Sequence, residues 1–270
     1  MAIAKAGEIN LEYFTEGSGP PLLLIMGFAG SAYTWGQPFI EALKRSFTVT
    51  RFSNRGTGGS DRPDAQTTIR MMADDTVALL DALGIERPHV MGISMGGYIA
   101  QELAINYPGR VNGLVLGCTG VGGPTAVQSD PQTMQSMAFD PSLPIADLVR
   151  KSWYALVSDG FVSSGHDFLE TMLSSILEHP TPMETIMKQV MAIAGHNVAE
   201  RDKAITAPTL VIHGDADRLV PPANGDQVAA AIPGAQKHTI HGVGHMFFWE
   251  KPEESARIVT EFLSRVPAGM

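Results

Sequence analysis

The sequence predicts an α/β protein whose core is a mostly parallel, doubly wound sheet with a helical cap inserted into it. Short apolar runs without polar alternation recur along the chain and are separated by segments of helical length and period. This pattern is typical of parallel strands that helices cover on both faces. Between Thr119 and Ile205 the rhythm stops. A chain of 270 residues is long enough for one large domain that carries such an insertion.

The first part of the chain supplies most of the expected sheet. Leu11–Phe14 is expected to be an edge strand, because the turn formers Gly17–Pro20 follow it. Buried strands and helices then alternate. The expected strands are Leu22–Met26, Phe47–Phe52, His89–Ile93 and Val111–Gly117, and the helices between them are Thr34–Arg45, Thr68–Leu83 and Ser94–Tyr107.

After residue 206 the alternation resumes. The apolar run Thr209–His213 and the run Lys237–Ile240 are expected to be strands, and Ala223–Ala231 and Pro252–Val266 have helical patterns. We therefore assign residues 1–118 and 206–270 to one α/β core domain.

The segment 119–205 is expected to form the helical cap, or lid. It opens with Gly120–Pro124, lacks clear strand patterns and holds six of the fourteen methionines. A separate small helical domain is the alternative. The cap is favoured because segments inserted at the carboxyl ends of strands lie over the crevice where doubly wound sheets bind ligands. Helical patterns are expected near Ile145–Val157, Asp167–Leu177 and Pro182–Ala194.

Composition argues against several classes of partner. The net charge is −9, which disfavours nucleic acid and anionic membranes. The single cysteine, Cys118, excludes an internal disulfide, and we interpret it as a buried strand residue. The first ten residues contain no apolar signal segment, and no run approaches 18 apolar residues, so we expect a cytoplasmic protein. The sequence does not indicate an oligomeric state.

The most informative motif is Gly92-Ile93-Ser94-Met95-Gly96, a G-x-S-x-G pattern between an expected strand and an expected helix. A serine at this sharp turn projects its hydroxyl from the backbone, and the flanking glycines let the chain turn without Cβ clashes. The amides that open the helix point to the same place and can stabilise an oxyanion. Ser94 is therefore the candidate nucleophile, and an inert serine in a glycine-rich turn is the alternative.

A serine nucleophile needs a base, and the base needs an orienting acid. We prefer His245 as the base, because Gly242–Met246 is a flexible turn at the carboxyl edge of the sheet. His241, at the end of a strand, is the alternative. We prefer Asp217 as the acid because it lies deeper in its loop than Asp215, which suits a role in the turn.

The other chemical groups are expected to be structural or remote from catalysis. His213 ends a strand and is interpreted as a structural histidine. The residues that follow Val111–Gly117 include no carboxylate that would replace Asp217. The chain has no G-x-G-x-x-G after a strand, no P-loop and no H-E-x-x-H. We therefore expect neither a cofactor nor a metal.

The chain order Ser94, Asp217, His245 resembles that of the α/β-hydrolase superfamily, and the resemblance extends over nearly the whole sequence. Two further segments, Leu80–Ile85 and Gln101–Ala104, resemble its capped serine esterase and enol-lactonase branch. The other matching motifs are Met26–Gly30, Asn54–Asp61, the serine turn, the Asp217 loop and Gly244-His245 before Glu250–Glu253.

The resemblance implies an oxyanion hole made by the backbone N–H groups of Phe28 and Met95. Two positions depart from the family pattern. Met26 stands where a histidine commonly precedes Gly27, and Ser53 stands where an aspartate is often found. Both departures are expected to affect local support of the loops and not the mechanism.

The resemblance also implies a cofactor-independent serine hydrolase that cleaves carboxylic esters through an acyl-enzyme intermediate, with lactones among the candidate substrates. The expected partner is thus a small-molecule ester or lactone. Cap residues are candidates for a pliable apolar pocket, with simple packing of the cap as the alternative. The candidate pocket residues are Met134, Met137, Trp153 and Met187.

Two other functions are compatible with the same motifs. An enol-lactonase or a C–C bond hydrolase would use the same triad and would need a basic group for a substrate carboxylate. The nearby candidates for that group are Arg150, Lys151, Lys188 and Arg201. From another class, a hydrolase fold can serve as a small-ligand receptor with little turnover.

Overall fold

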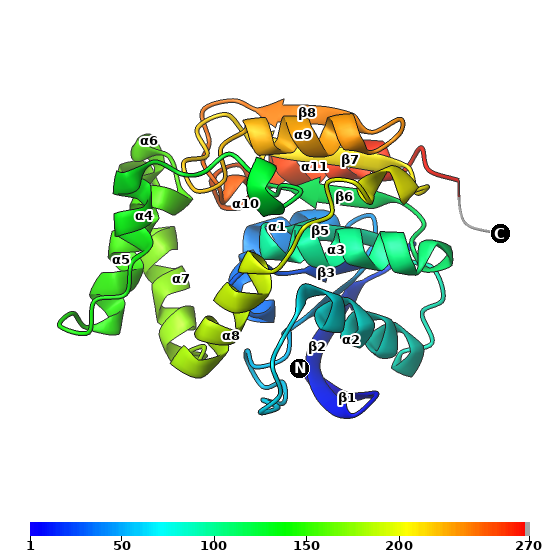
Figure 1. Cartoon of the computed structure of the whole chain (residues 1–270), viewed down its shortest axis with the longest axis horizontal. Helices are drawn as coiled ribbons and strands as arrows, with labels where there is room; N and C mark the ends of the chain where they lie inside the picture. The colour runs from blue at the N-terminus through cyan, green and yellow to red at the C-terminus, as the bar shows by residue number, and fades with distance from the viewer. Residues whose placement is uncertain (268–270) are drawn as a thin grey trace.

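One eight-stranded sheet runs through the computed structural model, which describes residues 1–267 (Figure 1). The strand order is β1-β2-β4-β3-β5-β6-β7-β8. The two pairs that involve β2 are antiparallel, and the five remaining pairs are parallel. The strands are β1 (Ala2–Ala6), β2 (Ile9–Gly17), β3 (Pro21–Ile25), β4 (Thr48–Phe52), β5 (His89–Ile93), β6 (Leu114–Gly117), β7 (Thr209–Gly214) and β8 (Gln236–Ile240).

Helices cover both faces of this sheet (Figure 1). One face packs against α1 (Gln37–Leu43), α10 (Phe247–Glu250) and α11 (Pro252–Leu263), and the other against α2 (Ile69–Ala82), α3 (Met95–Asn106) and α9 (Ala223–Ala231). Strand β3 shows why its sequence has no polar alternation. Leu22 and Leu24 enter one apolar cluster, while Leu23 and Ile25 enter the other. The predicted doubly wound fold is confirmed.

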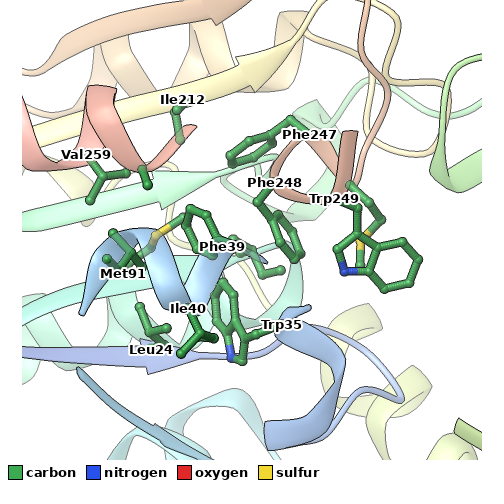
Figure 2. Packing of buried hydrophobic residues seen from close by; sticks show 14 of the residues in the cluster. Leu24, Trp35, Phe39, Ile40, Met91, Ile212, Phe247, Phe248, Trp249 and Val259 are labelled. Carbon is green, nitrogen blue, oxygen red and sulfur yellow. The ribbon is translucent and has the colours of Figure 1, made fainter. Parts of the chain in front are cut away.

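An aromatic cluster fixes the chain directly after His245. Phe248, in α10, packs against Trp35 and Phe39, with ring centroids 5.2 and 5.5 Å apart (Figure 2). All three rings are buried. Because a short helix anchored in the core follows the loop, the position of His245 is held from its carboxyl side.

Five helices lie between β6 and β7 and stand beyond one end of the sheet (Figure 1). The two ends of this insertion meet, because Gly122 and Asn197 form a β-bridge and Val198 N–H donates to the Val121 carbonyl at 2.9 Å. The predicted inserted helical cap is thus part of the fold, while the division at 118/119 and 205/206 stays a prediction. The helices are α4 (Pro131–Met137), α5 (Ile145–Leu156), α6 (Asp159–Ser164), α7 (His166–Glu178) and α8 (Met183–Ala194).

Local details differ from the sequence expectations. Leu11–Phe14 is part of β2, and the edge is formed by β1, whose residues are mostly alanine and therefore carry little strand signal. The expected helix Thr34–Arg45 is interrupted at Gly36, which has φ 76°. A short 3-10 turn, η1 (Ala32–Trp35), precedes that glycine and α1 follows it. Within residues 1–267, no helix is long and apolar enough to cross a bilayer.

Candidate active site

Ser94 occupies the strained turn between β5 and α3, with φ 53° and ψ −124°. Both flanking glycines are required by sterics. A Cβ on Gly92 would lie 2.1 Å from the Gly96 carbonyl oxygen, and a Cβ on Gly96 would lie 2.1 Å from the Ile25 carbonyl oxygen. A non-glycine residue at positive φ costs free energy and persists only where its surroundings fix it. The G-x-S-x-G spacing thus builds a turn that holds Ser94 half-buried at the edge of the sheet.

The first loop after β3 lies against Ser94. A Cβ on Gly27 would be 3.0 Å from Ser94 Cβ and 3.5 Å from Ser94 Oγ. Phe28 follows Gly27 directly, and Met95 is the first residue of α3. The structure thus brings both segments that carry the predicted oxyanion-hole amides to the serine, as such a hole requires.

The loop is supported differently from the common family pattern. Met26 is buried below it, and a Cβ on Gly30 would lie 2.7 Å from Met26 Cγ, so the side chain fills the space under the turn. Asn54 Nδ2 donates to the Met26 carbonyl at 3.0 Å. The Ser53 hydroxyl accepts from Ala32 N–H at 3.1 Å and donates to Glu12 at 2.8 Å. Apolar packing and these bonds support the loop without a histidine at position 26.

Asp217 and His245 form a buried pair. His245 Nδ1 lies 2.9 Å from Asp217 Oδ2, and the other carboxylate oxygen accepts from Val220 N–H at 2.9 Å. Both side chains are at most 3% exposed. The carboxylate therefore fixes the imidazole with Nδ1 as the donor, which leaves Nε2 free to act as a base.

The Ser94 hydroxyl makes no direct hydrogen bond to His245 among the described residues. Cys118, which we expected in the strand, directly follows β6 (Leu114–Gly117) with φ 41° and is fully buried beside His245. Catalytic hydrogen bonds often tighten only when substrate is bound.

Electrostatics of the pair favour the charged acid. Burial opposes ionisation of Asp217, but the charge of His245 and the hydrogen bonds from His213 and His245 hold its pKa below the ordinary 3.8. Burial lowers the pKa of His245, yet the Asp217 charge outweighs it and raises that pKa well above 6.5. Burial also raises the pKa of the Cys118 thiol, so this neighbour is neutral at physiological pH.

The two competing residues pair with each other at the surface. Asp215 Oδ2 lies 2.8 Å from His241 Nδ1, and Asp215 Oδ1 accepts from Gly242 N–H at 2.6 Å. The His241 side chain is 84% exposed. Asp215 thus bonds a local turn amide, and neither residue reaches the buried pair.

The sequence did not predict two contacts of the site. His213 is fully buried and its Nε2 lies 2.8 Å from the Val220 carbonyl and 3.1 Å from Asp217 Oδ2. Both neighbours are acceptors, so Nε2 must carry the proton and donate to them. The second missed contact is that of Cys118 with His245. A histidine four residues before the candidate acid is a sequence signal for the first, whereas nothing in the sequence indicates the second.

A large cavity lies under the cap, beside the loop 26–31 that carries Phe28, which we call the oxyanion loop. Its volume is about 1100 Å³, and its lining includes Phe28 and Ala29 but not Ser94, Met95 or His245. Of the predicted pocket residues, Met137 and Met187 line it. Trp153 and Met134 do not, because Trp153 is buried in the packed core on the inner side of α5 and Met134 is 54% exposed on α4. Helical spacing alone could not show which face of each cap helix lines the cavity and which packs in the core or faces solvent.

Among residues 1–267, no group of three or more His, Cys, Asp or Glu side chains is arranged to hold a metal ion. The polar groups that surround Ser94 are backbone amides, one thiol and the Asp217–His245 pair. This set suits acyl transfer, in which a serine attacks a carbonyl and an imidazole moves the proton.

Comparison with known proteins gives one family and several relatives. A family model described as the alpha/beta hydrolase fold matches residues 20–252. A 2-hydroxy-6-oxononadienedioate/2-hydroxy-6-oxononatrienedioate hydrolase of Burkholderia vietnamiensis (strain G4 / LMG 22486) is 30% identical over 277 residues, which cover 96% of this chain and 92% of that protein.

Solved structures have the same fold. The enol-lactonase from Burkholderia xenovorans LB400 superposes with a TM-score of 0.84 at 23% identity, covering 98% of this chain and 100% of that one. A thermophilic esterase from Thermogutta terrifontis superposes with a TM-score of 0.82 at 26% identity, covering 99% of each chain. These similarities extend over the cap as well as the sheet.

Proposed function

The chain belongs to the α/β-hydrolase fold family and is a hydrolase, and from this premise we propose that it cleaves carboxylic esters with Ser94 as the nucleophile. The observation that carries the proposal is the buried Asp217–His245 pair beside a serine on a strained strand-to-helix turn. No cofactor is needed, because a serine, its base and two amides suffice for acyl transfer.

The reaction follows from this arrangement in two halves. Ser94 Oγ bonds to the ester carbonyl carbon while His245 Nε2 takes its proton, and the Phe28 and Met95 amides hold the oxyanion. The C–O bond to the alcohol then breaks, and His245 returns the proton to the leaving oxygen. A water repeats these steps on the acyl-enzyme and releases the acid. Each oxyanion donor contributes about 3–4 kcal/mol in comparable enzymes.

The cavity supports an uncharged, largely apolar substrate. Most of its lining is apolar and comes from the cap helices and the oxyanion loop. The charged groups in its lining are Glu12, Glu178, Arg62 and the amino terminus at Met1, so the cavity has no excess of cationic groups. Taking an anionic substrate from water into such a site is unfavourable unless a cation pairs with it. Neutral esters with a sizeable apolar acyl or alcohol group fit best.

A C–C bond hydrolase is the second candidate, because the Burkholderia vietnamiensis relative carries such a name and its named substrate is a dicarboxylate. None of the four expected cations lines the cavity. Arg150 pairs with Glu170, and Arg201 pairs bidentately with Glu102. Lys188 donates to the Pro63 carbonyl at 2.9 Å. This distribution of charge favours a neutral ester over a dicarboxylate as the substrate.

A substrate panel tests the proposal. It contains p-nitrophenyl esters of increasing acyl length, a neutral lactone, and a 2-hydroxy-6-oxo-dienoate as C–C substrate. We expect the highest kcat/KM with a neutral ester of medium acyl length. If kcat/KM for the dienoate exceeds that for every ester by more than tenfold, the protein is a C–C bond hydrolase and not an esterase. Tight ester binding without turnover in a folded protein would indicate the ligand receptor.

A further inference from the structure

Two cap side chains hold one residue of the oxyanion loop. The Ala29 N–H donates to Gln189 Oε1 at 2.8 Å, and the Ala29 carbonyl accepts from the Thr181 hydroxyl at 2.8 Å. Gln189 belongs to α8, and Thr181 precedes that helix. Both polar groups of the Ala29 backbone are therefore bonded to the cap and not to the sheet domain.

Ala29 has a conformation that needs such support. Its φ is 55°, in the left-handed region that alanine rarely adopts because Cβ approaches its own carbonyl oxygen. A residue in this region remains there only when contacts from its surroundings outweigh the cost. Phe28, whose N–H is the proposed oxyanion donor, immediately precedes it. Without the two cap bonds, we expect Ala29 to relax and the Phe28 amide to turn with it.

Gln189 makes no other use of its amide among the described residues. Its side chain is buried, with 1% of the residue exposed, and Nε2 has no hydrogen-bond partner. Burying a primary amide with its donor group unsatisfied is costly. An apolar residue would pack at this position at lower cost. We therefore attribute the presence of glutamine here to its bond to the Ala29 N–H.

We propose that Gln189 and Thr181 are positioning residues that hold the oxyanion loop in its active conformation, so that closing the cap completes the oxyanion hole. The inference rests on the proposed role of the Phe28 amide in ester hydrolysis. It gives the cap a part in transition-state stabilisation as well as in substrate binding: an open cap leaves the serine, the base and the acid in place but lacks one oxyanion donor.

Gln189→Met and Thr181→Val each remove one of these bonds while keeping side-chain size. Thr185→Val is the matched control, because Thr185 is buried in the same helix α8 and also bonds from cap to sheet domain, to the Gly56 carbonyl at 3.2 Å. We expect each test variant to lower kcat at least about tenfold with KM changed less than about threefold. This loss is smaller than the 10²–10³-fold effect of removing an oxyanion donor outright. The control is expected to keep near wild-type kcat.

Two readouts separate positioning from simple packing. A trifluoromethyl ketone, which forms an oxyanion on Ser94, should lose affinity in parallel with kcat, while the acid product should not. In the Gln189→Met background, Ala29→Gly should restore part of kcat, because glycine adopts positive φ without a steric cost. If the variant loses activity through a packing defect alone, ketone affinity should not fall in parallel with kcat, and Ala29→Gly should not restore kcat.

Hydrogen–deuterium exchange of the loop 26–31 tests the same coupling without turnover. Gln189→Met should accelerate exchange there, and Thr185→Val should not. Unchanged kcat, ketone affinity and exchange in Gln189→Met would overturn the inference while leaving the ester proposal intact. If the wild-type protein cleaves no ester, the proposed function fails, and the exchange experiment alone still decides whether the cap holds the loop.

Discussion

At the residue scale, Asp217 connects more of the site than any other side chain described above. It accepts from His245, from His213 and from Val220 N–H while being fully buried. A buried carboxylate is stable only when its charge is compensated by such donors. Its nearest chemical equivalent, Asp215, is partly exposed and pairs with the exposed His241. The two aspartates are two residues apart in sequence, yet they differ completely in environment.

Replacing each aspartate by asparagine separates their roles. Asp217→Asn should lower kcat by about 10⁴-fold, following the precedent of serine proteases, because the imidazole loses its tautomer control and its counter-charge. Asp215→Asn, the matched control, should change unfolding free energy by no more than about 0.5 kcal/mol, as for other exposed substitutions. Steady-state kinetics and thermal unfolding of both variants provide the measurement. A dead Asp215→Asn enzyme with a native fold, beside an active Asp217→Asn enzyme, would show that the acid is misassigned.

The pH dependence of turnover follows from the charge of Asp217. His245 accepts the serine proton only when neutral, so kcat/KM should rise with pH through the pKa of His245. Burial lowers that pKa and the carboxylate raises it well above 6.5, so the acid limb should lie above pH 6.5. In Asp217→Asn the raising charge is gone and burial remains, so the limb should move to lower pH. A residual profile with an unmoved limb would exclude His245 as the titrating base.

Residue roles could be predicted only partly from sequence. The choice of Ser94, Asp217 and His245 depended on motifs and on their order along the chain, and both can be read from the sequence alone. The contact of His213 with Asp217 spans only four residues, and that spacing is a signal in the sequence. The contacts of Cys118 with His245 and of Gln189 with Ala29 join residues far apart along the chain. Such contacts depend on three-dimensional packing, and no local pattern encodes them.

At the scale of elements, the strand β5, the serine turn and the helix α3 form the best-specified unit. The predicted strand His89–Ile93 agrees with the structure in both bounds. Its residues are buried on both faces, so Val90 to Ile93 shows no alternation with polar residues. The helices α4 and α6 were not predicted, because seven and six residues are too few to show helical periodicity.

The close packing at this turn predicts a large effect of one methyl group. Gly92→Ala would place a Cβ 2.1 Å from the Gly96 carbonyl oxygen, so backbone must move. We expect destabilisation of about 3 kcal/mol or more, at the upper end of overpacking effects, together with loss of activity. Gly109→Ala is the control, since no atom lies within 4 Å of its added Cβ. Denaturant unfolding measures both, and equal stability of the two variants would show that the turn tolerates a side chain.

At the scale of the whole molecule, the sheet domain supplies the proposed catalytic groups and the cap supplies most of the cavity wall. The change from alternating strands and helices to helices alone was sufficient to predict this arrangement. It was not sufficient to predict which cap face lines the cavity, because Met137 and Met187 line it while Met134, on the same helix as Met137, does not. That difference depends on how α4 and α5 pack against each other, which a single sequence does not show.

The central claim is that Ser94 carries the acyl group, and covalent labelling tests it most directly. The wild-type protein is treated with a fluorophosphonate, and the modified peptide is identified by mass spectrometry, with Ser94→Ala as the control. We predict one label per chain, located on Ser94, with loss of ester turnover in proportion to labelling, and neither labelling nor turnover in a folded Ser94→Ala protein. A label on another residue, or near wild-type turnover by Ser94→Ala, would contradict the account.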